Sequence, residues 1–218
     1  QLAEVWVGET PPLLTAPTSP QDICGLTDDR LPTTHKAIGR FIFDAGPNQQ
    51  AYCTGWLAPN GAILTAGHCA DFDPYGAPDL IEFNVPTSTV AGVPQFAALT
   101  DQYPIDQRVD FHNNGLGDDW GVFTILANTE TELSAPIAQN AFLRVALPAD
   151  LVPTTVRVTG YGIDDTPDSW NRILQTHSGA FVGYNTTYVS YTVDTESGNS
   201  GSPVMATDSG ASIAIHTT

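Results

Sequence analysis

The chain has 218 residues, enough to bury a sizeable core in one compact unit or in two closely packed halves. Seven Lys and Arg against 24 Asp and Glu give a net charge of −17, and the single lysine, Lys36, cannot form the basic stripe that neutralises nucleic-acid phosphates. No apolar run approaches the roughly 20 residues of a membrane-spanning helix, so we expect neither a nucleic-acid nor a membrane partner.

The N-terminal part has no clear periodicity and contains four prolines before residue 21. We therefore expect residues 1–24 to be an N-terminal extension or pro-segment. Residue 1 is Gln rather than an initiating Met, from which we expect a processed, soluble product. We expect the protein to be secreted.

From Lys36 onward, short apolar runs alternate with turn residues, which predicts an all-β fold. The expected strands cover residues 40–43, 52–58, 62–66, 80–85, 89–99, 120–126, 155–161, 179–184, 188–193 and 211–216. Pro59-Asn60-Gly61 is a favourable hairpin turn between the second and third of these. The pattern weakens over residues 128–142, so we expect two β-halves, residues 25–130 and 131–218.

The first candidate for chemistry is His68, in T-A-G-H-C just past the predicted hairpin. A hydroxyl nucleophile needs a base within hydrogen-bond reach, a carboxylate that orients the base, and N–H donors for the oxyanion. A bond between Cys69 and Cys53 would fix the hairpin that carries this base. The third cysteine, Cys24, is then expected to remain a thiol or to pair outside the chain, with a further peptide.

The other parts of such a site lie in two later motifs. Asp119, in G-D-D-W-G-V-F-T-I, stands at the mouth of a predicted strand, and its neighbour Asp118 is the alternative, expected to lie in solvent. Ser200 lies in S-G-N-S-G-S-P-V, where the glycines allow a tight turn that presents the hydroxyl. The N–H groups of Gly198 and Ser200 would then point one way, as an oxyanion hole requires.

In these three motifs the sequence resembles the chymotrypsin-like serine endopeptidases. The resemblance implies two six-stranded antiparallel β-barrels with the active site in the cleft between them. His68 and Asp119 would come from the first barrel and Ser200 from the second. It also implies peptide-bond hydrolysis through an acyl-enzyme on Ser200, with no cofactor and with protein or peptide substrates.

Within that family the likeness is greatest to the bacterial glutamyl-endopeptidase branch, which has G-[NQ]-S-G-S-P-V and a histidine in the following strand, here His216. The resemblance nominates Asp194, Thr195 and His216 for the specificity pocket. We expect cleavage after Glu through His216 and Thr195, with trypsin-like cleavage after Lys or Arg through Asp194 as the alternative. T-D-D-R, residues 27–30, looks like the start of mature enzymes in this branch, which implies a zymogen.

The family continues beyond its serine with a further hairpin and a helix, whereas 18 residues follow Ser200 here. The resemblance therefore implies that the second barrel is incomplete and that a cysteine of the missing part would pair with Cys24. A catalytically silent binding module is the rival interpretation.

One acidic cluster has the spacing of a calcium loop. Asp71, Asp73, Asp79 and Glu82 fall at positions 1, 3, 9 and 12, with Gly at position 6, but Tyr75 at position 5 breaks the pattern. A solvated loop is the alternative. His35, His112 and His177 do not have metal-ligand spacing.

Overall fold

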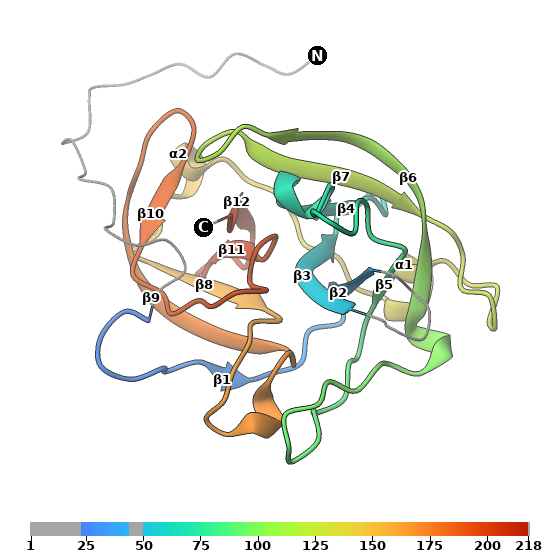
Figure 1. Ribbon diagram of the computed structural model, residues 1–218. Helices are drawn as coiled ribbons and strands as arrows, with labels where there is room; N and C mark the ends of the chain where they lie inside the picture. The colour runs from blue at the N-terminus through green and yellow to red at the C-terminus, as the bar shows by residue number, and fades with distance from the viewer. Residues whose placement is uncertain (1–22, 44–49, 218) are drawn as a thin grey trace.

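The first half of the chain forms a closed six-stranded antiparallel barrel (Figure 1). The computed structural model describes residues 23–43 and 50–217. The barrel strands, in the order in which they pair, are β2 (Ile38–Phe43), β3 (Gln50–Leu57), β4 (Ile63–Thr65), β7 (Asp119–Ile125), β6 (Gln102–Asn113) and β5 (Leu80–Glu82). The closed order leaves this half without a free sheet edge.

The interior of the barrel is filled by large apolar side chains. Phe41, Trp56 and Phe123 are at most 1% exposed, and the rings of Phe41 and Phe123 meet edge to face with their centroids 5.6 Å apart. The same core cluster continues out of the barrel through Tyr161 and Met205, which belong to the second half. A second apolar cluster, which includes Val156, Val158 and Val204, lies within the second half. The second half therefore has a core of its own, and the first core extends into it.

The second half is an open antiparallel sheet of six strands. Its strands pair in the order β1 (Leu31–Pro32), β9 (Gln175–Tyr184), β8 (Thr155–Gly160), β11 (Pro203–Ala206) and β12 (Ser212–Ile215), with β10 (Val189–Tyr191) also on β9. The expected first barrel is confirmed, and the second half, expected to be an incomplete barrel, is an open sheet. Within the described residues its end strands β1 and β12 do not pair with each other, so the sheet stays open. Strand β1 has only two residues and pairs with β9, at the opposite end of the sheet from β12.

All predicted strands are present except residues 89–99. That segment contains a turn in which the Gly92 N–H donates to the Thr89 carbonyl, with Gly92 at φ +75°, and it ends in a short 3₁₀ helix, η2 (Leu99–Asp101). The 12-residue strand β6 was missed because most of its side chains are exposed and it buries only Tyr103 fully, so its sequence lacks a clear alternation.

The α-helices of the described residues are short and lie between β7 and β8 along the chain. They are α1 (Ala135–Gln139) and α2 (Pro148–Leu151), both with a proline in the first turn. No helix in the described part of the chain is long and apolar enough to cross a membrane. The predicted pro-segment lies almost wholly outside the described residues and, like the boundary at residues 130 and 131, stays a prediction.

Candidate active site

His68 is carried by a single 3₁₀ turn, η1 (Gly67–Cys69), that follows β4. The disulfide Cys53–Cys69 ties this turn to β3, as predicted, and closes a loop with a sequence separation of 16. Such a cross-link stabilises a fold by about 3 kcal/mol in the chain-entropy model. Gly67 must be glycine, because a Cβ there would lie 1.8 Å from the carbonyl oxygen of His112.

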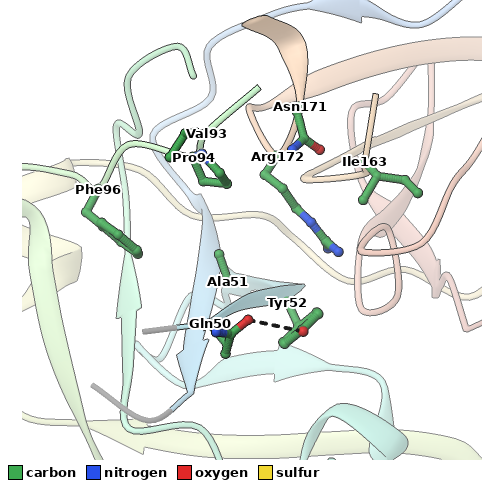
Figure 2. Close-up of a pocket in the computed structure, with 9 residues that line it drawn as sticks. All are labelled: Gln50, Ala51, Tyr52, Val93, Pro94, Phe96, Ile163, Asn171 and Arg172. Carbon is green, nitrogen blue, oxygen red and sulfur yellow. Dashed lines mark hydrogen bonds between the residues drawn. The ribbon is translucent and has the colours of Figure 1, made fainter. Parts of the chain in front are cut away.

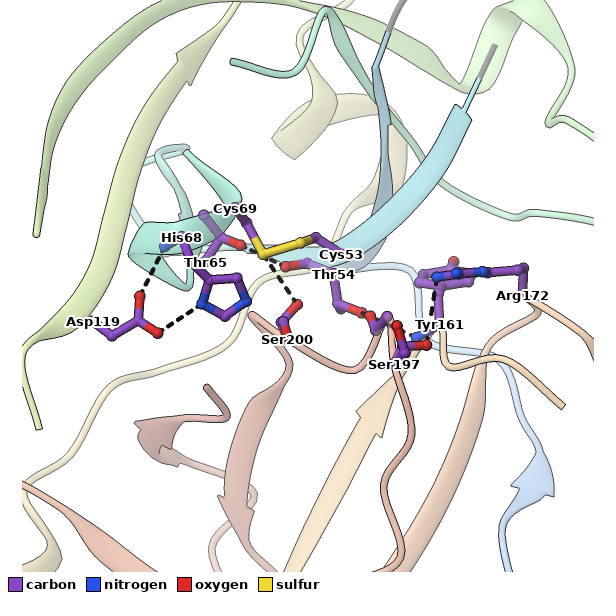
Figure 3. The surroundings of a disulfide bond; sticks show 11 residues. Cys53, Thr54, Thr65, His68, Cys69, Asp119, Tyr161, Arg172, Ser197 and Ser200 are labelled. Atoms are coloured by element: carbon purple, nitrogen blue, oxygen red, sulfur yellow. Dashed lines mark hydrogen bonds and ion pairs between the residues drawn. A yellow bond between two sulfur atoms is a disulfide. The ribbon is translucent and has the colours of Figure 1, made fainter. Parts of the chain in front are cut away.

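Asp119 is the first residue of β7 and is bound to His68 by two hydrogen bonds. The backbone N–H of His68 donates to Oδ1 at 2.8 Å, and Nδ1 lies 2.7 Å from Oδ2 (Figure 3). The side chain of Asp119 is 4% exposed and that of His68 is 26% exposed. A proton on Nδ1 satisfies the carboxylate and leaves Nε2 as the base.

Asp118, the alternative carboxylate, lies at the surface as expected. It accepts hydrogen bonds from Asn114 Nδ2 at 2.7 Å and pairs with His112 Nδ1 at 2.8 Å. These contacts, led by the one from Asn114, lower the pKa of Asp118. Asp119 is therefore the carboxylate that orients His68.

Ser200 lies in a tight turn whose two glycines are required by close contacts. Gly198 and Gly201 have φ of +103° and +89°. A Cβ on Gly201 would lie 2.0 Å from the carbonyl oxygen of Thr54. In Figure 3 the His68 ring stands between Asp119 and Ser200.

The turn is fastened to the barrel by Thr54 of β3, which the sequence analysis missed. The Thr54 N–H donates to the Ser200 carbonyl at 2.8 Å, and Thr54 Oγ1 donates to the Gly198 carbonyl at 2.9 Å. Sequence gives no signal for this role, because a buried threonine in a strand is ordinarily a packing residue.

Asn199 holds the turn through hydrogen bonds of its side chain. It is 2% exposed, and its Oδ1 accepts from the Glu196 N–H at 3.1 Å and from Arg30 Nη1 at 3.3 Å. Arg30 itself forms an ion pair with Asp28. The segment before β1 thereby supports the turn of residues 197–202 that carries Ser200, called the nucleophile turn below.

His216 lies just beyond β12 with one ring nitrogen bonded and the other without a partner. It is 3% exposed, and Nδ1 is 2.6 Å from the Tyr191 hydroxyl, while Nε2 is buried with no hydrogen-bond partner in the described chain. Burial, and then the charge of His68, lower the pKa of His216 to about 4, and burial raises the pKa of Tyr191. Both groups are therefore neutral at pH 7.

Both the backbone N–H and the backbone carbonyl of His216 form hydrogen bonds to the nucleophile turn. Its carbonyl accepts from the Gly201 N–H at 2.7 Å, and its N–H donates to the Ser202 carbonyl at 2.8 Å. The structure thus brings His216 next to the turn that carries Ser200.

Asp194 is 1% exposed and is held by the N-terminal segment. Its Oδ1 accepts from the Cys24 N–H at 2.7 Å and its Oδ2 from the Asp29 N–H at 2.8 Å, with His177 Nδ1 3.3 Å away. Its neighbour Thr195 is 3% exposed. Asp194 is therefore engaged with backbone amides rather than with His216.

Two groups of described residues have metal-like proximity, but neither offers three open ligands. In the first, Cys53, His68 and Cys69, the two sulfurs form the disulfide. In the second, Asp29, His177 and Asp194, both Asp194 oxygens already accept amide hydrogens. The Sγ of Cys24 lies 3.8 Å from the Val193 carbonyl, and its pairing outside the chain stays a prediction.

The calcium interpretation of Asp71, Asp73, Asp79 and Glu82 is wrong. Glu82 lies in β5, is fully buried, and accepts from Arg40 Nε at 2.8 Å and from the Ala97 N–H at 2.8 Å. With both carboxylate oxygens engaged inside the barrel, Glu82 cannot complete the ligand set.

Comparison with known proteins agrees with this geometry. Residues 53–215 match the family model of the trypsin-like peptidase domain. The glutamyl endopeptidase of Bacillus licheniformis is 28% identical over an alignment of 218 positions, which covers 93% of this chain and 62% of that protein. This chain therefore spans less than two thirds of that relative's length.

Solved structures share the fold. A Glu endopeptidase in complex with MPD has a TM-score of 0.67 and 19% identity, covering 90% of this chain and 87% of its own. A thermostable serine protease, AL20, from an extremophilic microorganism has a TM-score of 0.60 and 12% identity, covering 81% of each chain. The fold is chymotrypsin-like. Since the matched residues 53–215 include His68, Asp119 and Ser200, the chain belongs to the family of trypsin-like peptidase domains.

Proposed function

We propose that this chain is a secreted serine endopeptidase that cleaves peptide bonds after Glu through an acyl-enzyme on Ser200. The observation that carries the catalytic assignment is the pairing of His68 Nδ1 with Asp119 Oδ2 at 2.7 Å beside the glycine-framed turn of Ser200. The Cys53–Cys69 disulfide supports secretion, because such bonds persist in oxidising compartments.

The proposed reaction proceeds in two half-reactions. His68 Nε2 takes the proton of the Ser200 hydroxyl as Oγ attacks the carbonyl carbon, and the N–H groups of Gly198 and Ser200 bind the oxyanion. Collapse of the tetrahedral intermediate breaks the C–N bond, and His68 gives its proton to the leaving amine. Water, activated by the same histidine, then hydrolyses the ester and restores Ser200.

The buried, unpartnered Nε2 of His216 supports recognition of a carboxylate. The pKa of the Tyr191 hydroxyl is raised, so this group keeps its proton and can donate it to Nδ1. The neutral imidazole then carries its own proton on Nε2, where it can donate to a substrate carboxylate. A buried donor left without a partner in the free protein gains most when a ligand supplies the acceptor.

Cleavage after Lys or Arg would need the Asp194 carboxylate to face the substrate. Both its oxygens instead accept N–H groups of Cys24 and Asp29, so a substrate cation would compete with two short backbone hydrogen bonds. This contact favours the glutamyl alternative.

Matched peptides that differ only in Glu, Gln, Asp, Lys, Arg or Phe at the cleaved bond would test the assignment. We expect the highest kcat/KM for Glu, and we expect His216→Ala to raise KM for Glu peptides. A preference for Lys or Arg that Asp194→Ser abolishes would contradict the specificity but not the mechanism. Failure of an active-site phosphonate to label Ser200 would instead favour the binding-module alternative.

A further inference from the structure

A cavity of about 320 Å³ opens between the start of β3, the loop of residues 93–96 and the loop of residues 163–172 (Figure 2). Tyr52, Phe96 and Ile163 give its wall apolar surface, and Arg172 is the charged residue among those that line it. In Figure 2 the Arg172 guanidinium is directed toward the space between Tyr52 and Ile163. The cavity therefore has the make-up of a small-ligand site, an apolar wall with one placed charge.

Arg172 is a nearly buried cation with no carboxylate partner among the described residues. It is 9% exposed, and its side chain makes one long hydrogen bond, from Nη1 to the Ser197 carbonyl at 3.4 Å. The guanidinium also lies over the Tyr52 ring, 5.0 Å from its centroid. No carboxylate of residues 23–43 or 50–217 lies within ion-pair distance of it, although the chain has a net charge of −17.

The other arginines near the interior are paired, which makes Arg172 an exception. Arg30 is paired with Asp28, and fully buried Arg40 with Glu82. Burial lowers the pKa of Arg172 to about 10, the result expected for a cation removed from water without a counter-charge. Such a charge is stabilised strongly by an anion that enters beside it.

The position of Arg172 is fixed by the barrel. Its carbonyl accepts from Arg40 Nη1 at 2.6 Å, and its N–H donates to the Gly162 carbonyl at 3.0 Å. Since Arg40 is itself held by Glu82 inside the barrel, the backbone of Arg172 rests on a rigid support. A ligand would therefore meet a preorganised charge.

The cavity and His216 adjoin opposite ends of the nucleophile turn. Arg172 is bonded to Ser197 before Ser200, whereas His216 is bonded to Gly201 and Ser202 after it. Tyr52 precedes Cys53, whose disulfide leads to the turn of His68, the group that protonates the leaving amine. In Figure 3 Ser200 lies between His68 on one side and Ser197 with Arg172 on the other. A peptide with one side chain at His216 would thus reach the cavity with residues beyond the scissile bond.

We propose that this cavity binds a carboxylate of the leaving-group peptide and that Arg172 is its positioning residue. The inference rests on the endopeptidase function proposed above. The carboxylate can come from an acidic side chain within the first residues after the scissile bond or from the C-terminus of a short leaving peptide. Both sources offer two oxygens that match the planar guanidinium.

The test uses peptides of one sequence with Glu at the cleaved bond, an amidated C-terminus, and Asp or Asn at each of the first three positions beyond that bond. At one of these positions we expect kcat/KM to be roughly tenfold higher for Asp than for Asn. A peptide with a free C-terminus in place of the amide identifies the second source. Equal rates for every Asp–Asn pair, together with equal rates for the free and the amidated C-terminus, would overturn the proposal.

Variants connect the preference to Arg172. The Asp/Asn ratio within one enzyme cancels any general loss from disturbance of Ser197, and we expect Arg172→Gln to reduce this ratio to about one. Arg157→Gln is the matched control, because Arg157 is exposed on β8 and its loss changes the net charge equally. A ratio that survives Arg172→Gln would contradict the assignment.

A binding measurement separates this inference from the proposed function. With Ser200→Ala, fluorescence titration of the Asp and Asn peptides should give Kd values about tenfold apart, and equal values after Arg172→Gln is added. If wild-type protein cleaves no peptide, the proposed function fails while this comparison still decides the cavity. If wild-type protein cleaves Asp and Asn peptides equally, only the cavity assignment fails.

Discussion

Thr54 Oγ1 lies 2.9 Å from the Gly198 carbonyl oxygen and 3.0 Å from the Tyr161 backbone nitrogen, so this one hydroxyl both donates to and accepts from the second half of the molecule. The barrel that carries His68 is thereby locked to the turn that carries Ser200. The two halves contribute different catalytic groups, and their relative position depends on this buried contact.

Replacement of Thr54 by Val should disturb both the fold and catalysis. Valine has nearly the same shape but leaves the Gly198 carbonyl and the Tyr161 N–H without partners, which costs about 1–3 kcal/mol of unfolding free energy for each buried group. Thr54→Ser keeps the hydroxyl and is the control. Urea denaturation and kcat should be measured on both variants, and equal behaviour of the two would contradict this role of the hydroxyl.

Ser200→Ala and His68→Ala should each lower kcat by roughly 10⁴ to 10⁶, because the members of such a triad act as a unit. Thermal melting should change little, since neither side chain belongs to the core. Turnover and melting are measured on the same samples. More than about a tenth of the wild-type activity in Ser200→Ala would rule out the acyl-enzyme on this residue.

The stability of the protein should fall in acid partly because of His216. Its pKa is about 4 in the folded chain against 6.5 for an unperturbed histidine, so the unfolded state binds the proton first. The free energy of unfolding then decreases as the pH drops from about 6.5 to about 4, by roughly 3 kcal/mol for this group. His216→Gln should lose less stability over that range in urea titrations. Parallel curves for the two proteins would show that His216 does not titrate this way.

Loss of the Cys53–Cys69 disulfide should lower the free energy of unfolding by about 3 kcal/mol. The double variant Cys53→Ala/Cys69→Ala is compared with Cys24→Ser, which should leave that bond intact. Peptide mapping without reduction should recover the 53–69 pair from wild type. Recovery of Cys24 bonded to either of these cysteines would contradict the pairing.

The candidate catalytic residues could be predicted because each lies in a run of neighbouring residues that the proposed chemistry constrains. Gly198 and Gly201 are needed where a Cβ would strike Tyr161 or Thr54, so the motif around Ser200 carries a structural reason in its own sequence. Asp119 could be separated from Asp118 by its place at the start of a strand, and the structure buries it accordingly.

The contacts of Asp194 and Glu82 were not predictable, because they join residues that are distant in sequence and of common types. Asp194 is held by Cys24 and Asp29 across 170 and 165 residues, and nothing local marks these partners. Glu82 fits a calcium spacing by residue type, yet its pairing with Arg40 arises only when β2 and β5 meet. Strand β6 escaped detection since its long exposed face removes the alternation that reveals a strand.

The two backbone hydrogen bonds between His216 and the nucleophile turn separate the position of Ser200 from the choice of substrate. The main chain of residue 216 is bonded to the turn that carries Ser200, whereas its side chain contacts the Tyr191 hydroxyl. If His216 selects the substrate as proposed, a new side chain at this position changes the accepted substrate without moving the attacking oxygen. In such a fold the substrate preference can then change by single substitutions at this position, while the chemical step is preserved.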